Sequence, residues 1–167
     1  MVTAAIVYLI KSCVIGLLCW ALWSDTQSYK IPNKISLALI GLYPAWVMAT
    51  WPMVDPLGGL MIGGIFLAIG FALFATGVVG GGDAKLMAAF GLWVGPTMAV
   101  QFLFLTAVAG GGLALTIFLY ACGREQIWRN ASWGTMRAIG AQPIPYGIAI
   151  ALGGLAVLFQ LPIGGAL

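Results

Sequence analysis

The chain has 167 residues, of which 62% are hydrophobic and only 7% carry a charge. Soluble domains carry about 25% charged residues, so this composition excludes a water-soluble globular protein and predicts a surface that faces lipid. The net charge of +3 comes from scattered lysines and arginines, which excludes the basic cluster of a nucleic-acid-binding protein. No break in composition divides the chain, so residues 1–167 are expected to form a single membrane-embedded domain.

The pattern of apolar residues predicts an all-α, polytopic membrane protein with about six transmembrane helices. The first apolar segment has the length of a true span and no basic flank, so it is not read as a cleavable signal peptide. The fourth segment ends at Pro96 and is about 18 Å long as a helix, against a hydrocarbon core of about 30 Å. The predicted spans are Ala4–Ser24, Ile35–Trp51, Leu57–Val79, Ala84–Gly95, Thr97–Cys122 and Ile144–Leu161.

The distribution of charges predicts the orientation of these spans. If they alternate in direction, one side of the membrane receives six of the seven basic residues, which are Lys30, Lys34, Lys85, Arg124, Arg129 and Arg137. Lys11 lies within the first span and is expected to snorkel outward, while Asp55 lies on the opposite side. The positive-inside rule then makes the basic side cytoplasmic and places both termini outside, in the cell inner membrane. The loop 123–143, with Trp128 and Trp133, is expected to lie on the inner leaflet.

The chain has no histidine and three cysteines, Cys13, Cys19 and Cys122. The cysteines form no CxxC pair, and their odd number does not fit a disulfide framework, so they are read as buried apolar thiols. The usual ligands of a zinc site are therefore missing, and the sequence predicts neither a metal nor another cofactor.

Four acidic residues remain as candidates for chemistry, and two have a structural explanation. Asp55 fits a turn beside Pro56, and Glu125 can pair with Arg129 four residues later. Asp25 and Asp83 are both predicted on the cytoplasmic side. Taken singly, Asp25 could end the first span and Asp83 could be the N-cap of the short fourth helix.

Taken together, Asp25 and Asp83 suggest a protease dyad. Ionisable residues within a membrane protein are functional by default, and the short helix after Asp83 suggests a wet cavity open to the cytoplasm. Two neighbouring carboxyl groups that share one proton can activate water and polarise an amide carbonyl without histidine or metal. The glycines Gly80, Gly81 and Gly82 would let an extended substrate backbone approach Asp83.

Three motifs resemble those of a known family. The run Gly80-Gly81-Gly82-Asp83-Ala84-Lys85-Leu86 is similar to the GxGDxKL motif of type IV prepilin peptidases, which are GxGD aspartyl proteases. Asp25 followed by Ile31-Pro32-Asn33 is similar to the family's first motif, and Pro145-Tyr146-Gly147 to a third. The resemblance implies that Asp25 and Asp83 are catalytic and that Gly80, Gly81, Gly82 and Lys85 bind substrate.

The resemblance also implies the substrate and the subfamily. The substrate would be a prepilin-like, single-span membrane protein whose short basic leader is removed at the cytoplasmic face. Only Asp25–Lys34 separates the first two spans, where longer members carry an insertion with paired cysteines. The chain therefore looks like the short form found with tight-adherence (Flp-type) pilus systems, the TadV/CpaA kind. Nothing in it resembles a methyl-donor site, so N-methyltransferase activity is not expected.

Two alternative functions are compatible with a small polytopic membrane protein: a non-enzymatic role and proteolysis of a different substrate. A small transporter or a pilus-assembly subunit would need no catalytic pair, but a transporter should place its polar groups near the bilayer centre, often within an inverted repeat. The polar residues here gather on one side, and no such repeat is visible. A GxGD protease of another substrate class, such as a presenilin-like or a preflagellin-cleaving enzyme, would share the chemistry and differ only in its substrate.

Overall fold

The structure, a computed structural model, describes residues 2–123 and 146–162. Within these residues the chain forms α-helices and no β-strand, which confirms the predicted all-α class. The helices are α1 (Val2–Ser28), α2 (Asn33–Thr50), α3 (Pro56–Ala75), α4 (Gly81–Gly123) and α7 (Tyr146–Leu158). The predicted interfacial loop 123–143 lies almost wholly outside the described residues.

Helix α4 consists of two limbs that meet at a break. Gly95 has φ 55° and ψ −170°, outside the helical region. The following Pro96 disfavours a helical conformation for the residue before it, and glycine adopts a positive φ without steric cost. The sequence prediction of a break at Pro96 is therefore confirmed. The first limb, residues 81–94, is about 21 Å long as a helix.

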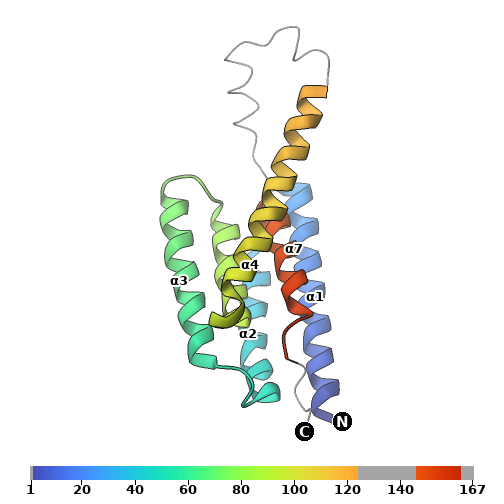
Figure 1. Cartoon of the computed structure of the whole chain (residues 1–167), viewed down its shortest axis with the longest axis vertical. Helices are drawn as coiled ribbons and strands as arrows, with labels where there is room; N and C mark the ends of the chain where they lie inside the picture. Colours follow the sequence, from blue (N-terminus) through green and yellow to red (C-terminus); the bar gives the residue numbers. More distant parts are fainter. Residues whose placement is uncertain (1, 124–145, 163–167) are drawn as a thin grey trace.

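The helical segments alternate in direction along the chain. In Figure 1, α1, α3 and the second limb of α4 run upward, whereas α2, the first limb of α4 and α7 run downward. Three helical stretches are long and apolar enough to cross a membrane, namely Thr3–Ser28, Pro56–Ala75 and Gly81–Tyr120. Residues Tyr146–Leu158 form a shorter apolar helix. The chain is therefore a helical protein with several apolar segments, and the count of six spans stays a prediction.

Helix α1 extends one turn beyond its predicted end. The sequence placed Asp25 at the start of a polar loop, but the helix continues to Ser28 and the loop is confined to residues 29–32. The hydroxyl groups of Thr26 and Ser28 donate to backbone carbonyls within the helix, at 2.7 and 2.9 Å. These bonds satisfy polar groups that would otherwise favour a loop. Tyr29, with φ 52°, ends the helix.

The first limb of α4 lies at the centre of the packed side chains. Leu86 and Phe90 of this limb are completely buried, and the Trp93 Nε1–H donates to the carbonyl oxygen of Leu39 in α2 at 3.2 Å. Trp93 also packs against Tyr43 and Trp46 of α2. Many large apolar side chains on the outside of the bundle are exposed, as a surface in lipid requires.

Lys11 is buried rather than extended to an interface. Only 8% of the residue is exposed, and its Nζ donates to the carbonyl oxygen of Leu161, just beyond the end of α7, at 2.7 Å. The ammonium group also lies 5.7 Å from the centre of the Trp46 ring, a cation–π contact. The expected outward snorkelling of Lys11 is therefore replaced by an internal bond between α1 and the chain after α7.

Close packing of α3 against α4 generates a stability prediction. A Cβ added to Gly59 would lie 2.6 Å from the backbone carbonyl oxygen of Leu92 and against the Tyr43 hydroxyl, whereas one added to Gly64 meets nothing within 4 Å. We expect Gly59→Ala to lower the free energy of unfolding by about 1–3 kcal/mol, because the backbones must separate. Gly64→Ala, on the same helix, should be neutral or slightly stabilising. Unfolding in detergent micelles measures both, and equal stabilities would contradict the packing.

Candidate active site

Asp25 lies in the last turns of α1, with its carboxylate against the N-terminus of α7. The residue is only 3% exposed, and its Oδ2 accepts a hydrogen bond from the backbone N–H of Ile148 at 3.2 Å. The backbone of Gly147 also faces this carboxylate. Free N–H groups at a helix N-terminus attract anions. Asp25 therefore joins α1 to a helix more than a hundred residues away in the sequence.

Asp83 lies in the first turn of α4 and is half-buried. The sequence prediction started this helix at Ala84, with Asp83 as a possible N-cap. The structure starts it at Gly81, and the Ala84 N–H donates to the carbonyl oxygen of Gly80 at 3.1 Å. Asp83 is thus the third helical residue, and its carboxyl group turns back toward the backbone of Gly80. An acidic residue at this position satisfies N-terminal amide groups and suits the helix dipole.

Ile31, from the short loop between α1 and α2, is wedged between these two helix ends. A Cβ added to Gly82 would lie 3.1 Å from the Ile31 Cβ, and one added to Gly147 would lie 2.6 Å from the Ile31 Cδ1. The side chain itself is 8% exposed. At Gly147 a side chain would clash with Ile31, and at Gly82 it would require Ile31 to shift slightly, so glycine lets both helices approach Ile31 closely.

The two predicted catalytic residues therefore lie in one region of the molecule. The C-terminal end of α1 and the N-terminal ends of α4 and α7 gather at the same end of the bundle, the upper end in Figure 1. Gly147, which lies against the Asp25 carboxylate, and Gly82, next to Asp83, both pack on the side chain of Ile31. Asp55 lies elsewhere, exposed at the start of α3, where its Oδ1 accepts from the Leu57 N–H at 3.1 Å. Its predicted structural role is confirmed.

The glycine run does not leave open space in this conformation. A Cβ on Gly80 would lie 2.8 Å from the Asp83 Oδ2, and one on Gly81 would lie 3.3 Å from the Phe74 ring. Gly82 faces Ile31 in the same way. The glycines thus make room for the chain's own side chains, and a substrate backbone would have to displace them.

Lys85 reaches the N-terminus of α2. Its Nζ donates to the Asn33 Oδ1 at 3.1 Å. Both residues line a groove of about 440 Å³ between α2, α3 and α4. The bond joins the predicted Ile-Pro-Asn motif to the glycine–aspartate motif. This contact and the wedge formed by Ile31 were not predicted from the sequence, although both residues belong to motifs that the sequence shows.

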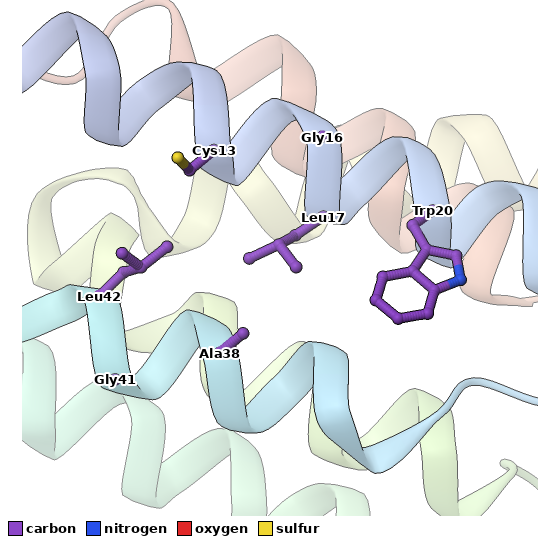
Figure 2. Close-up of a pocket in the computed structure, with 7 residues that line it drawn as sticks. All are labelled: Cys13, Gly16, Leu17, Trp20, Ala38, Gly41 and Leu42. Carbon is purple, nitrogen blue, oxygen red and sulfur yellow. The ribbon is translucent and has the colours of Figure 1, made fainter.

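A second groove, between α1 and α2, is not part of this region. Figure 2 shows its seven lining residues, and its volume is about 560 Å³. The lining is apolar, without either aspartate, so the groove offers no group for acid–base chemistry. Cys13 lies on it, and both Cys13 and Cys19 are exposed, which corrects the expectation that they are buried. The lining residues are Cys13, Gly16, Leu17, Trp20, Ala38, Gly41 and Leu42.

The described part of the chain contains no group of three or more His, Cys, Asp or Glu side chains that could hold a metal ion. Asp25 and Asp83 are together only two such ligands. The chemistry that these residues offer by themselves is proton transfer and hydrogen bonding between two carboxyl groups.

Comparison with known proteins decides the family. Residues 12–115 match the sequence profile of the type IV leader peptidase family. The chain belongs to the type IV leader peptidase family. Two prepilin leader peptidase/N-methyltransferases, from Burkholderia pseudomallei strains 1026b and K96243, are each 33% identical to it over 143 residues. A protein of the same name from Xanthomonas campestris pv. campestris is 29% identical over 141 residues. No solved structure gives a significant match.

The matches cover unequal shares of the two chains. Each alignment covers 81% of this chain, but only 41% of each Burkholderia protein and 44% of the Xanthomonas protein. The chain thus spans about two-fifths of the length of the curated relatives that it matches. The family predicted from the motifs is confirmed, while the roles of individual residues remain predictions.

The contact between Asp25 and α7 generates a prediction for Gly147. A Cβ at this position would lie 2.7 Å from the Asp25 Oδ2. We expect Gly147→Ala to push the carboxylate off the Ile148 N–H, and amide hydrogen exchange at the start of α7 to become about tenfold faster. Gly41→Ala is the matched control, since its Cβ meets nothing within 4 Å. Unchanged exchange in Gly147→Ala, measured by mass spectrometry, would refute the contact.

Proposed function

We propose that this chain is an intramembrane aspartic endopeptidase that removes the short basic leader of prepilin-like membrane proteins. The observation that carries the proposal is that the end of α1, which contains Asp25, and the start of α4, which contains Asp83, lie at the same end of the bundle (Figure 1). Membership of the type IV leader peptidase family supports it. So do the names of the Burkholderia and Xanthomonas relatives, which specify a prepilin leader peptidase.

Two carboxyl groups supply all the proton transfers of peptide hydrolysis. The ionised carboxylate takes a proton from a water molecule, whose oxygen attacks the scissile carbonyl carbon, while the protonated partner gives its proton to the carbonyl oxygen. The C–N bond then breaks as the first carboxyl group passes its proton to the leaving nitrogen. The second carboxylate recovers a proton from the tetrahedral hydroxyl group. One water is consumed, and both carboxyl groups return to their starting states.

We assign the role of base to Asp25. Its Oδ2 accepts the Ile148 N–H at the N-terminus of α7, and such donors stabilise a carboxylate anion. Asp83, which is half-buried, would then be the protonated partner that polarises the substrate carbonyl. Ile31 lies between the two helix ends and would move aside when an extended substrate backbone reaches Gly80, Gly81 and Gly82.

The proposed substrate is a single-span protein whose basic leader stays in the cytoplasm. Lys30 lies between α1 and α2, Lys34 lies in the first turn of α2, and Lys85 lies in the first turns of α4. These positions are near the helix ends that carry Asp25 and Asp83, which supports the positive-inside orientation. In this orientation the enzyme has six spans in the inner membrane, with both termini outside. The aspartates then lie where a substrate's leader meets its apolar helix.

We also propose that the chain is of the short, tight-adherence type and acts on Flp-type prepilins. This rests on the short Asp25–Lys34 connection, of which only residues 29–32 are outside helices. The curated relatives are named for N-methyltransferase as well as peptidase activity. The expectation that this chain lacks the methyltransferase remains a prediction.

Replacing either aspartate should stop the reaction. We expect Asp25→Asn and Asp83→Asn each to lower prepilin cleavage by at least about a thousandfold, and the double variant to be no worse, because the two groups act as a unit. Asp55→Asn should cleave normally, since asparagine also serves as an N-cap. A gel shift after co-expression with a prepilin measures cleavage. Substantial residual cleavage by either single variant would remove that residue from the mechanism.

The proposed orientation is tested by thiol labelling in a variant without Cys13, Cys19 and Cys122. A cysteine that replaces the exposed Met53 should react with an impermeant maleimide in intact spheroplasts. One that replaces the exposed Lys30 should react only after the membrane is permeabilised. Labelling of position 30 in intact spheroplasts would invert the topology and contradict a cytoplasmic active site.

A further inference from the structure

The groove between α2, α3 and α4 changes from polar to apolar along its length. Asn33 and Lys85 mark one end, at the N-termini of α2 and α4, and Ser36 lies one turn further along α2. The remaining lining is apolar or glycine, over a volume of about 440 Å³. These other residues are Leu37, Ile40, Leu60, Gly63, Gly64, Leu67, Ala88, Ala89 and Leu92.

Ser36 is the feature of this groove that the packing does not explain. The residue is only 5% exposed, and its Oγ has no hydrogen-bond partner in the part of the chain that the structure describes. A buried hydroxyl group without a partner costs free energy. Because Ser36 lines the groove, a ligand with an acceptor oxygen at that depth would satisfy it.

We propose that this groove binds an anionic phospholipid. The order of its lining groups matches the order of groups in a glycerophospholipid. The Lys85 ammonium and the Asn33 amide meet the phosphate, the Ser36 hydroxyl donates to an ester carbonyl oxygen, and one acyl chain lies along the apolar part. Basic pockets between transmembrane helices recognise anionic lipid head groups in this way.

A lipid fits this groove better than the apolar helix of a substrate. The carbonyl groups of a helix are bonded within the helix, so it has no free backbone acceptor for Ser36. The proposed substrate leader is basic, and Lys85 would repel it. The sequence resemblance implied that Lys85 binds substrate, whereas its position in the groove suits a role in binding the lipid phosphate. One point of this proposal rests on the proposed function: the orientation given there would place the phosphate of the lipid in the cytoplasmic leaflet.

The test uses the whole protein in phosphatidylcholine vesicles that contain a trace of photoactivatable lipid, with a diazirine in the acyl chain. Labelled peptides are mapped by mass spectrometry, with a phosphatidylglycerol probe compared with a phosphatidylcholine probe. We expect labelling of residues 60–67 and 88–92, stronger with phosphatidylglycerol by about fivefold, the contribution of one lysine near the surface. Lys85→Gln should remove this excess.

A matched pair of glycine variants tests the acyl-chain part. A Cβ at Gly64 or at Gly41 meets nothing within 4 Å, so a side chain can begin at both positions without a clash. Gly64→Leu fills this groove and should reduce its labelling at least about fivefold, whereas Gly41→Leu fills the groove of Figure 2 and should not. Equal labelling of the two variants, or no preference for phosphatidylglycerol in the unmodified protein, would overturn the proposal.

Competition separates the lipid from the substrate. A synthetic prepilin segment that displaces the photoactivatable lipid from residues 60–67 would assign the groove to the substrate and contradict the proposal, whereas undiminished labelling would support it. Photolabelling does not require peptidase activity, so the competition experiment can also be carried out with the Asp25→Asn variant. Failure of the lipid proposal is therefore distinguishable from failure of the peptidase proposal.

Discussion

The carboxylate of Asp25 rests against the N-terminus of α7, and the candidate site is arranged around that contact. Gly147 makes the contact possible, because any side chain there would meet the carboxylate and Ile31. Ile31 in turn sets how closely α4 can approach, through Gly82. The helix starts that contain Gly147 and Gly82 therefore pack on the same isoleucine side chain. Two carboxyl groups that are proposed to act on the same peptide bond would need this kind of rigid support.

The same two helices are joined a second time, at the opposite end of α7. Lys11 donates to the carbonyl oxygen of Leu161, fourteen residues before Asp25 on α1 and thirteen after Ile148. The two bonds fix the register of α1 against α7 along the whole length of α7. A cation near the C-terminus of α7 and an anion at its N-terminus both complement the helix dipole. A sliding motion of α7 would break both bonds, so any opening for substrate is expected from the Ile31 loop.

Local sequence signals predicted much of the fold and the family, and they indicated Asp25 and Asp83 as the candidate catalytic pair. Apolar runs located the helices, Pro96 located the break in α4, and the motif around Asp83 indicated the family. The sequence did not show that Asp25 lies within α1, because the hydroxyl groups of Thr26 and Ser28 extend that helix through a polar stretch. Nor did it show which helix receives the Asp25 carboxylate, because that depends on three-dimensional packing.

The roles of the glycines were also beyond local prediction. In sequence, Gly80, Gly81 and Gly82 look like a flexible run that leaves space for a substrate. In the structure two of them begin α4, and each faces a side chain of the same protein. The difference arises because a missing side chain permits close packing as readily as it permits a bound ligand. Only the surrounding atoms, here from Phe74 and Ile31, decide between these uses.

The proposed mechanism requires Asp25 and Asp83 to lie close enough together to act on one peptide bond. Its most direct test is cross-linking of Asp25→Cys and Asp83→Cys, in a variant without native cysteines, by a short bifunctional thiol reagent in the membrane. We predict a cross-link between these positions, read by mass spectrometry of the joined peptides. The pair Asp25→Cys and Asp55→Cys, at opposite ends of the bundle, should give none. Failure of the first pair to cross-link, although each cysteine alone reacts with the reagent, would contradict the account.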